Sequence, residues 1–243
     1  SKGGFDLTIG PITELWHIGF DDARKPEQSE IDEALKLVDY TKVQLNEEEH
    51  TVFLEEKGMR LDLGAIAKGF ITDEAVDVLV DNGVTSGIVD LGGNIFVLGD
   101  SPRSEDGTWK VGIQDPNEAR NTIAGSIREK DMSLVTSGIY ERNLEVDGKI
   151  YHHLFDGRTG YPFDNEIAGV TIISETSVAG DGLSTGVFAM GLKGGMEYVE
   201  SRKDIDAIFI TKDDDIYLSS RVQKTFELNT DSPYTIKDIK DVK

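Results

Sequence analysis

Short apolar runs separated by polar or glycine-containing turns occur along most of the chain, and they predict many short strands. Two of these runs, Val43–Leu45 and Thr51–Leu54, flank Asn46 and an acidic stretch and predict a hairpin. Asp147-Gly148, between two further runs, is a favoured two-residue hairpin turn. The remaining predicted strands are Gly87–Leu91, Ile95–Leu98, Trp109–Ile113, Ser133–Val135, Asn143–Val146, Lys149–Leu154, Val170–Ile173, Ala207–Ile210 and Ile216–Leu218.

Apolar residues at helical spacing predict several helices. The first follows Pro26 and takes Ser29 as its N-cap. Its apolar positions are Ile31, Ala34, Leu35 and Val38. The second covers Phe70–Asn82 and ends before Gly83, because glycine is favoured just past a helix C-terminus. Further helices are predicted at Ala179–Met190 and Gly195–Ser201.

Strands that mostly neighbour one another along the chain, with helices grouped around them, predict an α+β fold with a largely antiparallel sheet. No repeat, low-complexity stretch or linker-like segment interrupts the sequence. Residues 1–243 are therefore expected to form a single domain, which is long enough to bury a substantial core.

Composition and charge exclude several classes of function. The formal net charge of −21 repels nucleic-acid phosphates and anionic lipid headgroups, so no nucleic-acid partner is expected. Cysteine is absent, which excludes disulfides, thiolate metal sites and a cysteine nucleophile. No apolar run approaches the roughly 20 residues that span a bilayer, so direct membrane insertion by this chain is not expected.

Asp181 and Thr185 are the first candidates for chemistry. They lie four residues apart, so their side chains share one face of the predicted helix. A carboxylate, a hydroxyl and a backbone carbonyl from elsewhere would suit an oxygen-preferring cation such as Mg²⁺. A structural alternative makes Asp181 an N-cap and lets Thr185 bond its own helix backbone. The pair alone leaves both interpretations open.

A second candidate is the small-residue turn Gly64–Gly69, which contains Lys68 and precedes the predicted helix. It is not a P-loop, because the lysine precedes the second glycine and Phe70 stands where Ser or Thr is required. Such a turn still presents backbone N–H groups and a helix dipole to a phosphate, and Lys68 would add a positive charge. A plain helix start with a solvent-facing lysine is the structural alternative.

His152 and His153 are adjacent in a predicted strand, so their side chains should point to opposite faces. Only one of them is expected to enter a site, where its imidazole would accept a proton from an attacking hydroxyl. A structural hydrogen-bonding role is the alternative. The sequence contains neither a Gly-x-Ser-x-Gly nor a Gly-x-Gly-x-x-Gly motif, which argues against a serine hydrolase and a Rossmann site.

Taken together and in this order, the segments resemble the ApbE family, the FAD:protein FMN transferases. The matching segments are Gly4–Thr8, Gly10-Pro11, Trp16, Leu61–Asp73, Asp90–Gly99, Thr136–Gly138, Tyr151–Pro162 and Ala179–Gly191. The resemblance implies a single T-fold-like α+β domain that binds FAD and Mg²⁺. Its implied activity is cleavage of FAD and transfer of FMN to a threonine or serine of a target protein, with release of AMP.

The resemblance also implies roles for residues by position. The implied metal ligands are Asp181, Thr185 and the backbone carbonyl of Ala65. The implied FAD contacts are Gly4, Phe5, Asp6, Asp62, Lys68, His153 and Phe155. Among these, Lys68 would lie near the pyrophosphate, and His153 would act as the general base.

The chain departs from the family pattern in three ways. Asp156-Gly157 replaces the usual Asp-Pro, and Gly180-Asp181-Gly182 replaces Ala-Asp-Ala, so a looser loop and helix start are expected. Family members also carry further N-terminal residues, including a Met-Gly-Thr-like segment that contacts FAD, so the domain is expected to be N-terminally truncated. These departures keep two alternatives open, a FAD-binding or carrier module and a FAD pyrophosphatase, both without transfer to protein.

The acceptor implied by the resemblance is an exported protein with a Thr/Ser flavinylation motif. Thr85-Ser86-Gly87 and Thr136-Ser137-Gly138 lack the Gly-Ala-Thr-like continuation of the family's targets, so a separate protein should receive the FMN. The implied location is outside the cytoplasmic membrane, with this protein anchored to the membrane as a lipoprotein through residues upstream of Ser1.

Overall fold

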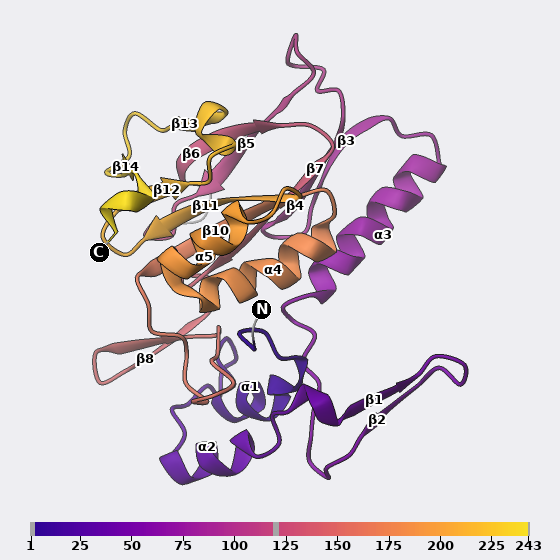
Figure 1. Cartoon of the computed structure of the whole chain (residues 1–243), viewed down its shortest axis with the longest axis vertical. Helices are drawn as coiled ribbons and strands as arrows, with labels where there is room; N and C mark the ends of the chain where they lie inside the picture. Colours follow the sequence, from indigo (N-terminus) through magenta and orange to yellow (C-terminus); the bar gives the residue numbers. More distant parts are fainter. Residues whose placement is uncertain (1–2, 119–121, 243) are drawn as a thin grey trace. The chain divides into compact units, whose positions relative to one another are not determined.

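The computed structural model describes residues 3–118 and 122–242. The chain divides into two compact units, which are described in turn (Figure 1). Unit 1 comprises Ser1–Leu63 and Ile139–Asp164, and unit 2 comprises Gly64–Gly138 and Asn165–Lys243. Across the described residues, no helix combines the length and the apolar character needed to cross a membrane.

Unit 1 combines short helices with two separate hairpins. Its helices are α1 (Gly10–Trp16), α2 (Gln28–Leu35) and the 3-10 turns η1 (Leu7–Ile9) and η2 (Tyr40–Lys42). Its strands are β1 (Val43–Asn46), β2 (Thr51–Leu54), β8 (Asn143–Val146) and β9 (Lys149–His152), paired as β1–β2 and β8–β9. Both hairpins predicted from the sequence are therefore confirmed.

The core of unit 1 forms around Trp16, which is fully buried. Its ring centroid lies 5.1 Å from that of Tyr151, 5.8 Å from Phe155 and 5.5 Å from Tyr161. Its indole N–H donates to the carbonyl of Gly160 at 2.9 Å, which satisfies the one polar atom of the side chain. These contacts fasten the 151–161 segment to α1.

Two local predictions in unit 1 are wrong. Ser29 lies inside α2, and Glu27 is the N-cap, joined to Glu30 in a capping box. The Glu27 N–H donates to the Glu30 carboxylate at 2.9 Å. In addition, β9 ends at His152, so His153 and Leu154 lie beyond the strand.

Unit 2 is built on a seven-stranded sheet with the order β14-β12-β11-β10-β7-β4-β3. Its strands are β3 (Ser86–Asp90), β4 (Asn94–Gly99), β7 (Met132–Gly138), β10 (Ile167–Ser174), β11 (Ile205–Thr211), β12 (Asp215–Leu218) and β14 (Thr235–Lys237). All neighbouring strands are antiparallel except β12 and β14. The prediction of an α+β fold with a largely antiparallel sheet is confirmed.

A smaller sheet covers one face of this large sheet. It has three strands in the order β13-β6-β5, namely β5 (Trp109–Gln114), β6 (Ile123–Glu129) and β13 (Phe226–Leu228). Between the sheets lies an apolar cluster that includes Val97, Leu134 and Ile208 on one side and Ile127 and Phe226 on the other. Strands β6, β13 and β14 were not predicted from the sequence.

Helices occupy the other face of the large sheet (Figure 1). They are α3 (Ala67–Asp81), α4 (Ser177–Ala189) and α5 (Gly191–Glu200), and the 3-10 turns η3 (Val222–Lys224) and η4 (Ile239–Asp241) lie nearer the C-terminus. Each long helix begins two to four residues before the predicted start. Helices α3 and α4 begin earlier than predicted because the N-terminus of each is capped by a carboxylate of the other helix.

Helices α3 and α4 cap each other with carboxylates from their second turns. The backbone N–H of Gly69, in the first turn of α3, donates to Asp181 Oδ2 at 2.7 Å. Conversely, the N–H groups of Ser177 and Val178, at the start of α4, donate to the two carboxylate oxygens of Asp73 at 2.7 and 2.8 Å. Both carboxylates also complement the positive ends of the helix dipoles. The two N-termini are thereby fixed side by side.

This arrangement requires a glycine at position 69. A Cβ placed on Gly69 would lie 2.4 Å from the Ser177 carbonyl oxygen and 2.7 Å from Asp181 Cβ.

We expect Gly69→Ala to destabilise the protein by about 1–3 kcal/mol, because the backbones of α3 and α4 must separate. Thermal unfolding by circular dichroism measures this effect. Gly194→Ala is the matched control, since its Cβ would meet Met190 at an ordinary 3.5 Å, and it should not lower the melting temperature. Equal melting temperatures for Gly69→Ala and the wild type would contradict the close packing.

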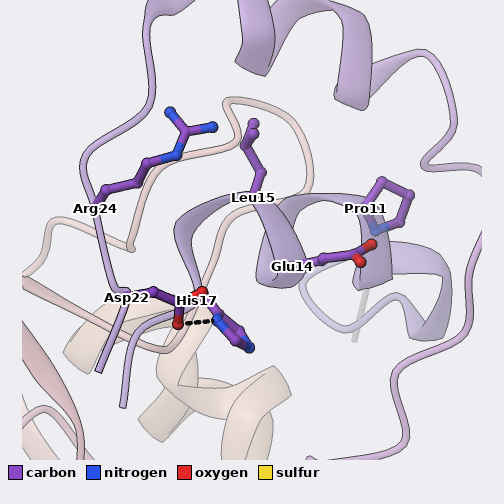
Figure 2. Close-up of a pocket in the computed structure, with 6 residues that line it drawn as sticks. All are labelled: Pro11, Glu14, Leu15, His17, Asp22 and Arg24. Carbon is purple, nitrogen blue, oxygen red and sulfur yellow. Dashed lines mark hydrogen bonds and ion pairs between the residues drawn. The ribbon is translucent and has the colours of Figure 1, made fainter. Parts of the chain in front are cut away.

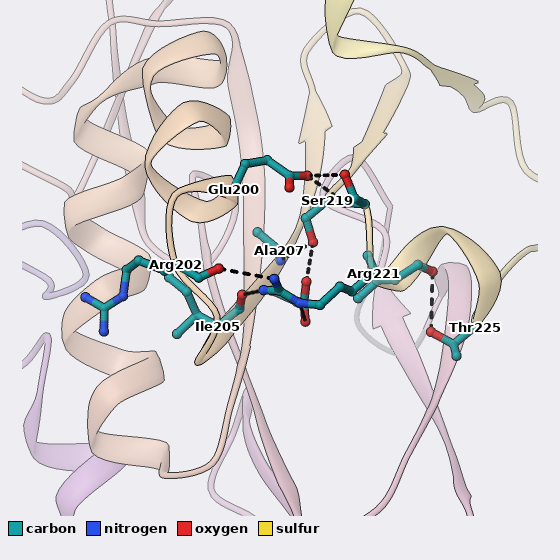
Figure 3. Close-up of polar contacts among 10 residues, drawn as sticks. Glu200, Arg202, Ile205, Ala207, Ser219, Arg221 and Thr225 are labelled. Atoms are coloured by element: carbon teal, nitrogen blue, oxygen red, sulfur yellow. Dashed lines mark hydrogen bonds and ion pairs between the residues drawn. The ribbon is translucent and has the colours of Figure 1, made fainter.

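Arg221 ties the start of β11 to the segment after β12 (Figure 3). Its guanidinium donates to the carbonyl of Arg202 at 3.1 Å, to the carbonyl of Ile205, and to the Asp206 carboxylate at 3.0 Å. Asp206 also accepts from the Ser219 hydroxyl at 2.7 Å. The network gives the carbonyls of Arg202 and Ile205, at the connection from α5 to β11, hydrogen-bond partners. Its role is therefore structural, within unit 2.

The carboxyl group of Glu129, at the end of β6, has a raised pKa. Burial, with a smaller contribution from the charge of Asp206, raises its pKa from 4.5 to about 7. The folded state therefore keeps a proton that the unfolded state loses between about pH 4.5 and pH 7, so stability falls as pH rises through this window.

We expect Glu129→Gln to raise the melting temperature at pH 8 and to have little effect near pH 4. Melting curves across this range measure the difference. Glu105→Gln, at an exposed position, controls for the loss of one negative charge from an acidic protein. An increase in melting temperature that is the same at both pH values, or the same as that of Glu105→Gln, would show that burial of Glu129 does not cause the pH dependence.

Candidate functional site

The residues predicted to bind Mg²⁺ all lie in unit 2. Asp181 and Thr185 are both buried, at 5% and 8% exposure, and they share one face of α4 as their spacing predicted. Asp181 uses Oδ2 to accept the Gly69 N–H. The structure thus assigns Asp181 a capping role, but for α3 and not for its own helix as the structural alternative supposed.

The turn that contains Ala65 lies beside the start of α4. A Cβ on Gly182 would lie 3.4 Å from Ile66 Cδ1, so the turn residue after Ala65 packs against the residue after Asp181. This is an ordinary contact distance for a Cβ, so the close packing does not require glycine at position 182. The other glycine, Gly180, approaches the sheet, where its Cβ would lie 2.8 Å from Val135 Cγ2.

Lys68 lies at the second position of α3, and its side chain is exposed. Its ammonium donates to the carbonyl of Gly92 at 3.3 Å. The Gly92-Gly93 turn is held in turn by Asp90, whose carboxylate accepts the Gly92 N–H at 3.0 Å. Lys68 therefore projects over a glycine turn, beside the start of a helix, where an anion would be favourably placed.

The donor types in unit 2 fit a hard cation such as Mg²⁺. Asp181 brings a carboxylate, Thr185 a hydroxyl and Ala65 a backbone carbonyl, and oxygen ligands of these kinds are those that Mg²⁺ prefers. Within the described part of the chain, no three carboxylate or imidazole side chains gather at one point. A cation here would consequently depend on hydroxyl, carbonyl and substrate oxygens as well as on Asp181.

Asp73 and Asn94 are polar residues of this region that sequence reasoning missed. Asp73 caps α4, but its sequence position mid-helix gives no capping signal. Asn94 is fully buried at the start of β4, paired with Val135 on the helix-facing side of the sheet. Among the described residues, neither its amide nitrogen nor its amide oxygen has a hydrogen-bond partner. Its position directly after Gly92-Gly93 is the only sequence signal that could have drawn attention to it.

The remaining predicted residues lie in unit 1, where Asp6 organises a turn. Asp6 is the N-cap of η1, since its Oδ1 accepts the Thr8 N–H at 2.8 Å and the Thr8 hydroxyl at 2.7 Å. Its Oδ2 accepts the Tyr40 N–H at 3.3 Å. The Asp62 N–H donates to the Leu7 carbonyl at 2.8 Å. The structure thus brings Asp62 to the turn that contains Asp6, with Gly4 and Phe5 just before it.

The two histidines differ in burial, and only His152 belongs to strand β9, whereas the sequence predicted both within one strand. His152 is buried, and its ring is bonded on both sides: Nε2 donates to the Phe163 carbonyl at 2.9 Å, and Nδ1 accepts the Leu154 N–H at 3.3 Å. These partners require the neutral tautomer with its proton on Nε2. His152 therefore has a structural role.

His153 is less buried than His152 and makes a different ring contact. Its Nδ1 lies 3.2 Å from the Arg142 carbonyl, which can only accept, so Nδ1 carries the proton. In the neutral ring Nε2 then holds the lone pair, as a general base requires. Phe155, also predicted to line the flavin, packs in the core of unit 1 against Trp16.

A pocket of about 260 Å³ in unit 1 contains none of the predicted residues (Figure 2). It is lined by Pro11, Glu14, Leu15, His17, Asp22 and Arg24. Its charged groups are engaged with one another or with neighbours: His17 bonds Asp22 at 2.6 Å, Arg24 bonds Glu30 at 2.7 Å, and Glu14 bonds Arg60 at 2.8 Å. We assign no function to this pocket.

Comparison with known proteins gives consistent matches. The family model described as "ApbE family" matches residues 1–209. A protein of Klebsiella pneumoniae named FAD:protein FMN transferase is 42% identical over 96% of this chain and 71% of its own length. A protein of Treponema pallidum with the same name is 38% identical over 91% of this chain and 64% of its own length.

The fold is similar to that of solved structures as well. The crystal structure of the ApbE protein of Thermotoga maritima matches with a TM-score of 0.83 and 31% sequence identity, over 92% of this chain and 72% of that chain. The chain thus spans between 64% and 72% of the length of these three proteins.

Proposed function

Because the chain belongs to the ApbE family, we propose that it acts as a Mg²⁺-dependent FAD:protein FMN transferase. In the proposed reaction, a threonine or serine hydroxyl of an acceptor protein attacks the FMN phosphorus of FAD. A new phosphoester bond forms, the pyrophosphate P–O bond breaks, and AMP leaves. The acceptor is proposed to be an exported protein, and both proteins are proposed to act outside the cytoplasmic membrane.

The observation that carries this proposal is the arrangement at the start of α4. Asp181 and Thr185 are buried on one helix face, and the turn with Ala65 packs beside them. In the proposal these three residues hold Mg²⁺. When bound, the cation would supply positive charge that neutralises the pyrophosphate as its bond breaks.

The other roles follow the chemistry of the side chains. Lys68, at the N-terminal end of α3, would bind the pyrophosphate through its charge and the adjacent backbone N–H groups. Asp62 and the Gly4-Phe5-Asp6 segment would bind the flavin nucleotide. His153 would take the proton of the attacking hydroxyl at Nε2, while the Arg142 carbonyl keeps the ring in the required tautomer.

Incubation with FAD and Mg²⁺, with and without an acceptor, tests this proposal. The acceptor would be a peptide with a central Gly-Ala-Thr sequence, followed by mass spectrometry for an added FMN and by chromatography for AMP. Release of AMP together with FMN on the peptide would support a transferase. AMP and free FMN without an adduct would instead indicate a pyrophosphatase, and bound but intact FAD would indicate a carrier module. A parallel sample with EDTA tests the dependence on Mg²⁺.

A further inference from the structure

The hairpin β1–β2 of unit 1 has an apolar face that is largely exposed. Val43 pairs with Leu54 and Leu45 pairs with Val52, so these four aliphatic side chains lie on one face. At the outer end of the hairpin, Leu45 is 71% exposed and Val52 is 55% exposed. An isolated two-stranded hairpin is only marginally stable in water, and additional contacts on an apolar face would stabilise it.

Both edges of the hairpin can accept another strand. In the part of the chain that the structure describes, β1 and β2 form a sheet of their own, with no third strand paired to either. The Glu55 N–H donates to the Lys42 carbonyl at 3.1 Å, so these two residues form a hydrogen-bonded pair. In an antiparallel hairpin such pairs alternate with pairs whose backbone N–H and C=O groups point away from the partner strand. By this alternation the backbone N–H and C=O of Leu45 and Val52 point outward, along the two edges. An extended polypeptide could therefore pair with the hairpin through its backbone.

The base of the hairpin lies beside residues to which the proposed function gives a role in FAD binding. Tyr40, in the turn that leads into β1, donates its backbone N–H to the Asp6 carboxylate at 3.3 Å. After β2 the chain returns to the same turn, where the Asp62 N–H donates to the Leu7 carbonyl. A polypeptide that lies along the hairpin would consequently be led toward Asp6 and Asp62.

The charge of the hairpin indicates the kind of segment that would bind. Its tip carries Glu47, Glu48 and Glu49, all exposed, and Asn46 accepts the Glu49 N–H at 3.0 Å to hold the turn. These carboxylates favour a partner with lysine or arginine at the matching end, and they disfavour a second copy of this acidic chain.

We propose that the β1–β2 hairpin is the docking element for the acceptor protein, which adds an extended, basic-flanked segment along a hairpin edge and covers Leu45 and Val52. This inference rests on the proposed function, because it identifies the binding surface for the protein substrate of that reaction. The hairpin positions the acceptor polypeptide and takes no part in cleaving FAD.

The test uses the double variant Leu45→Ser/Val52→Ser and a fluorescein-labelled 16-residue peptide. The peptide has a central Gly-Ala-Thr sequence, alternating valines and terminal lysines, and a second version carries terminal glutamates. Fluorescence anisotropy without FAD measures peptide binding, and flavin fluorescence without peptide measures FAD binding separately. We expect the double variant to bind the lysine peptide about tenfold or more weakly than the wild type, with unchanged FAD binding. The glutamate peptide should bind more weakly than the lysine peptide.

Ile150→Ser is the matched control, because Ile150 is a 59% exposed aliphatic residue on the other hairpin of the same unit. It should bind the peptide like the wild type. Equal binding by the double variant and the wild type would overturn the proposal, as would an equal loss in Ile150→Ser. A wild-type dimer that becomes a monomer only in the double variant would also overturn it, because a second copy would then be the occupant. Absence of both AMP release and an FMN adduct when the wild type is incubated with FAD, Mg²⁺ and the lysine peptide would refute the transferase function instead, while the anisotropy measurement would still test the docking surface.

Discussion

In the Asp181→Ala variant we expect Mg²⁺-dependent release of AMP from FAD to fall by at least about 100-fold, to the level seen with EDTA. Loss of a group that merely supports a metal ligand already lowers affinity or activity by about 10–100-fold, and Asp181 is the carboxylate of the proposed donor set. The substitution also removes the acceptor of the Gly69 N–H, so stability should fall by about 1 kcal/mol.

Asp73→Ala separates these two effects. Asp73 accepts two N–H groups at the start of α4, so its loss should destabilise the helix pair at least as much as the loss of Asp181. It has no proposed metal contact, and the variant should keep its response to Mg²⁺. AMP release with magnesium titration, together with melting curves, measures both properties. A folded Asp181→Ala protein with a wild-type magnesium response would refute the metal assignment.

In the His153→Ala variant we expect FMN transfer to slow by about 10²–10⁴-fold, with little change in FAD binding or in melting temperature. The loss of rate follows from removing the proton acceptor for the attacking hydroxyl. Fold stability should change less than in a variant of a buried histidine, because His153 is only partly buried and its Nδ1 hydrogen bond to the Arg142 carbonyl is long, at 3.2 Å. Single-turnover transfer and FAD titration by flavin fluorescence measure rate and binding separately.

His152→Ala should behave in the opposite manner. His152 is buried and bonds the Phe163 carbonyl and the Leu154 N–H, so alanine would remove a hydrogen-bond partner from both backbone groups. We expect a lower melting temperature by several degrees and a smaller loss of transfer rate. If His152→Ala loses more activity than His153→Ala at a temperature where both are folded, the general base has been assigned to the wrong histidine.

Local patterns were sufficient to predict most of the regular structure. Short apolar runs on either side of Asn46 with its acidic stretch, and of the Asp147-Gly148 turn, predicted both hairpins of unit 1, because hairpins depend on residues close in sequence. Strand β6, by contrast, contains Gly125 and Ser126, and it is held by pairing with β5 and β13. Pairing between distant strands can override a weak local preference, so this strand was missed.

Helix boundaries were less accurate for a related reason. The residues that cap α2 are close to it in sequence, but residue type alone suggests Ser29 as the N-cap. The structure instead uses Glu27, which forms a capping box with Glu30. The starts of α3 and α4 are not local at all. Each is capped by a carboxylate 104 to 112 positions away in the sequence, which no local rule anticipates.

The sequence by itself determined the α+β class, the family resemblance and the identity of the candidate groups, since these depend on residue type and spacing. The shared helix face of Asp181 and Thr185 belongs to this set, because a spacing of four residues places them there on any α-helix. Only the tertiary structure decided what Asp181 contacts, why Gly69 must be a glycine, and that His152 is buried with both ring nitrogens bonded to the backbone. These properties depend on the close approach of α3 to α4 and on the path of the chain around His152, which arise from packing between segments distant in the sequence.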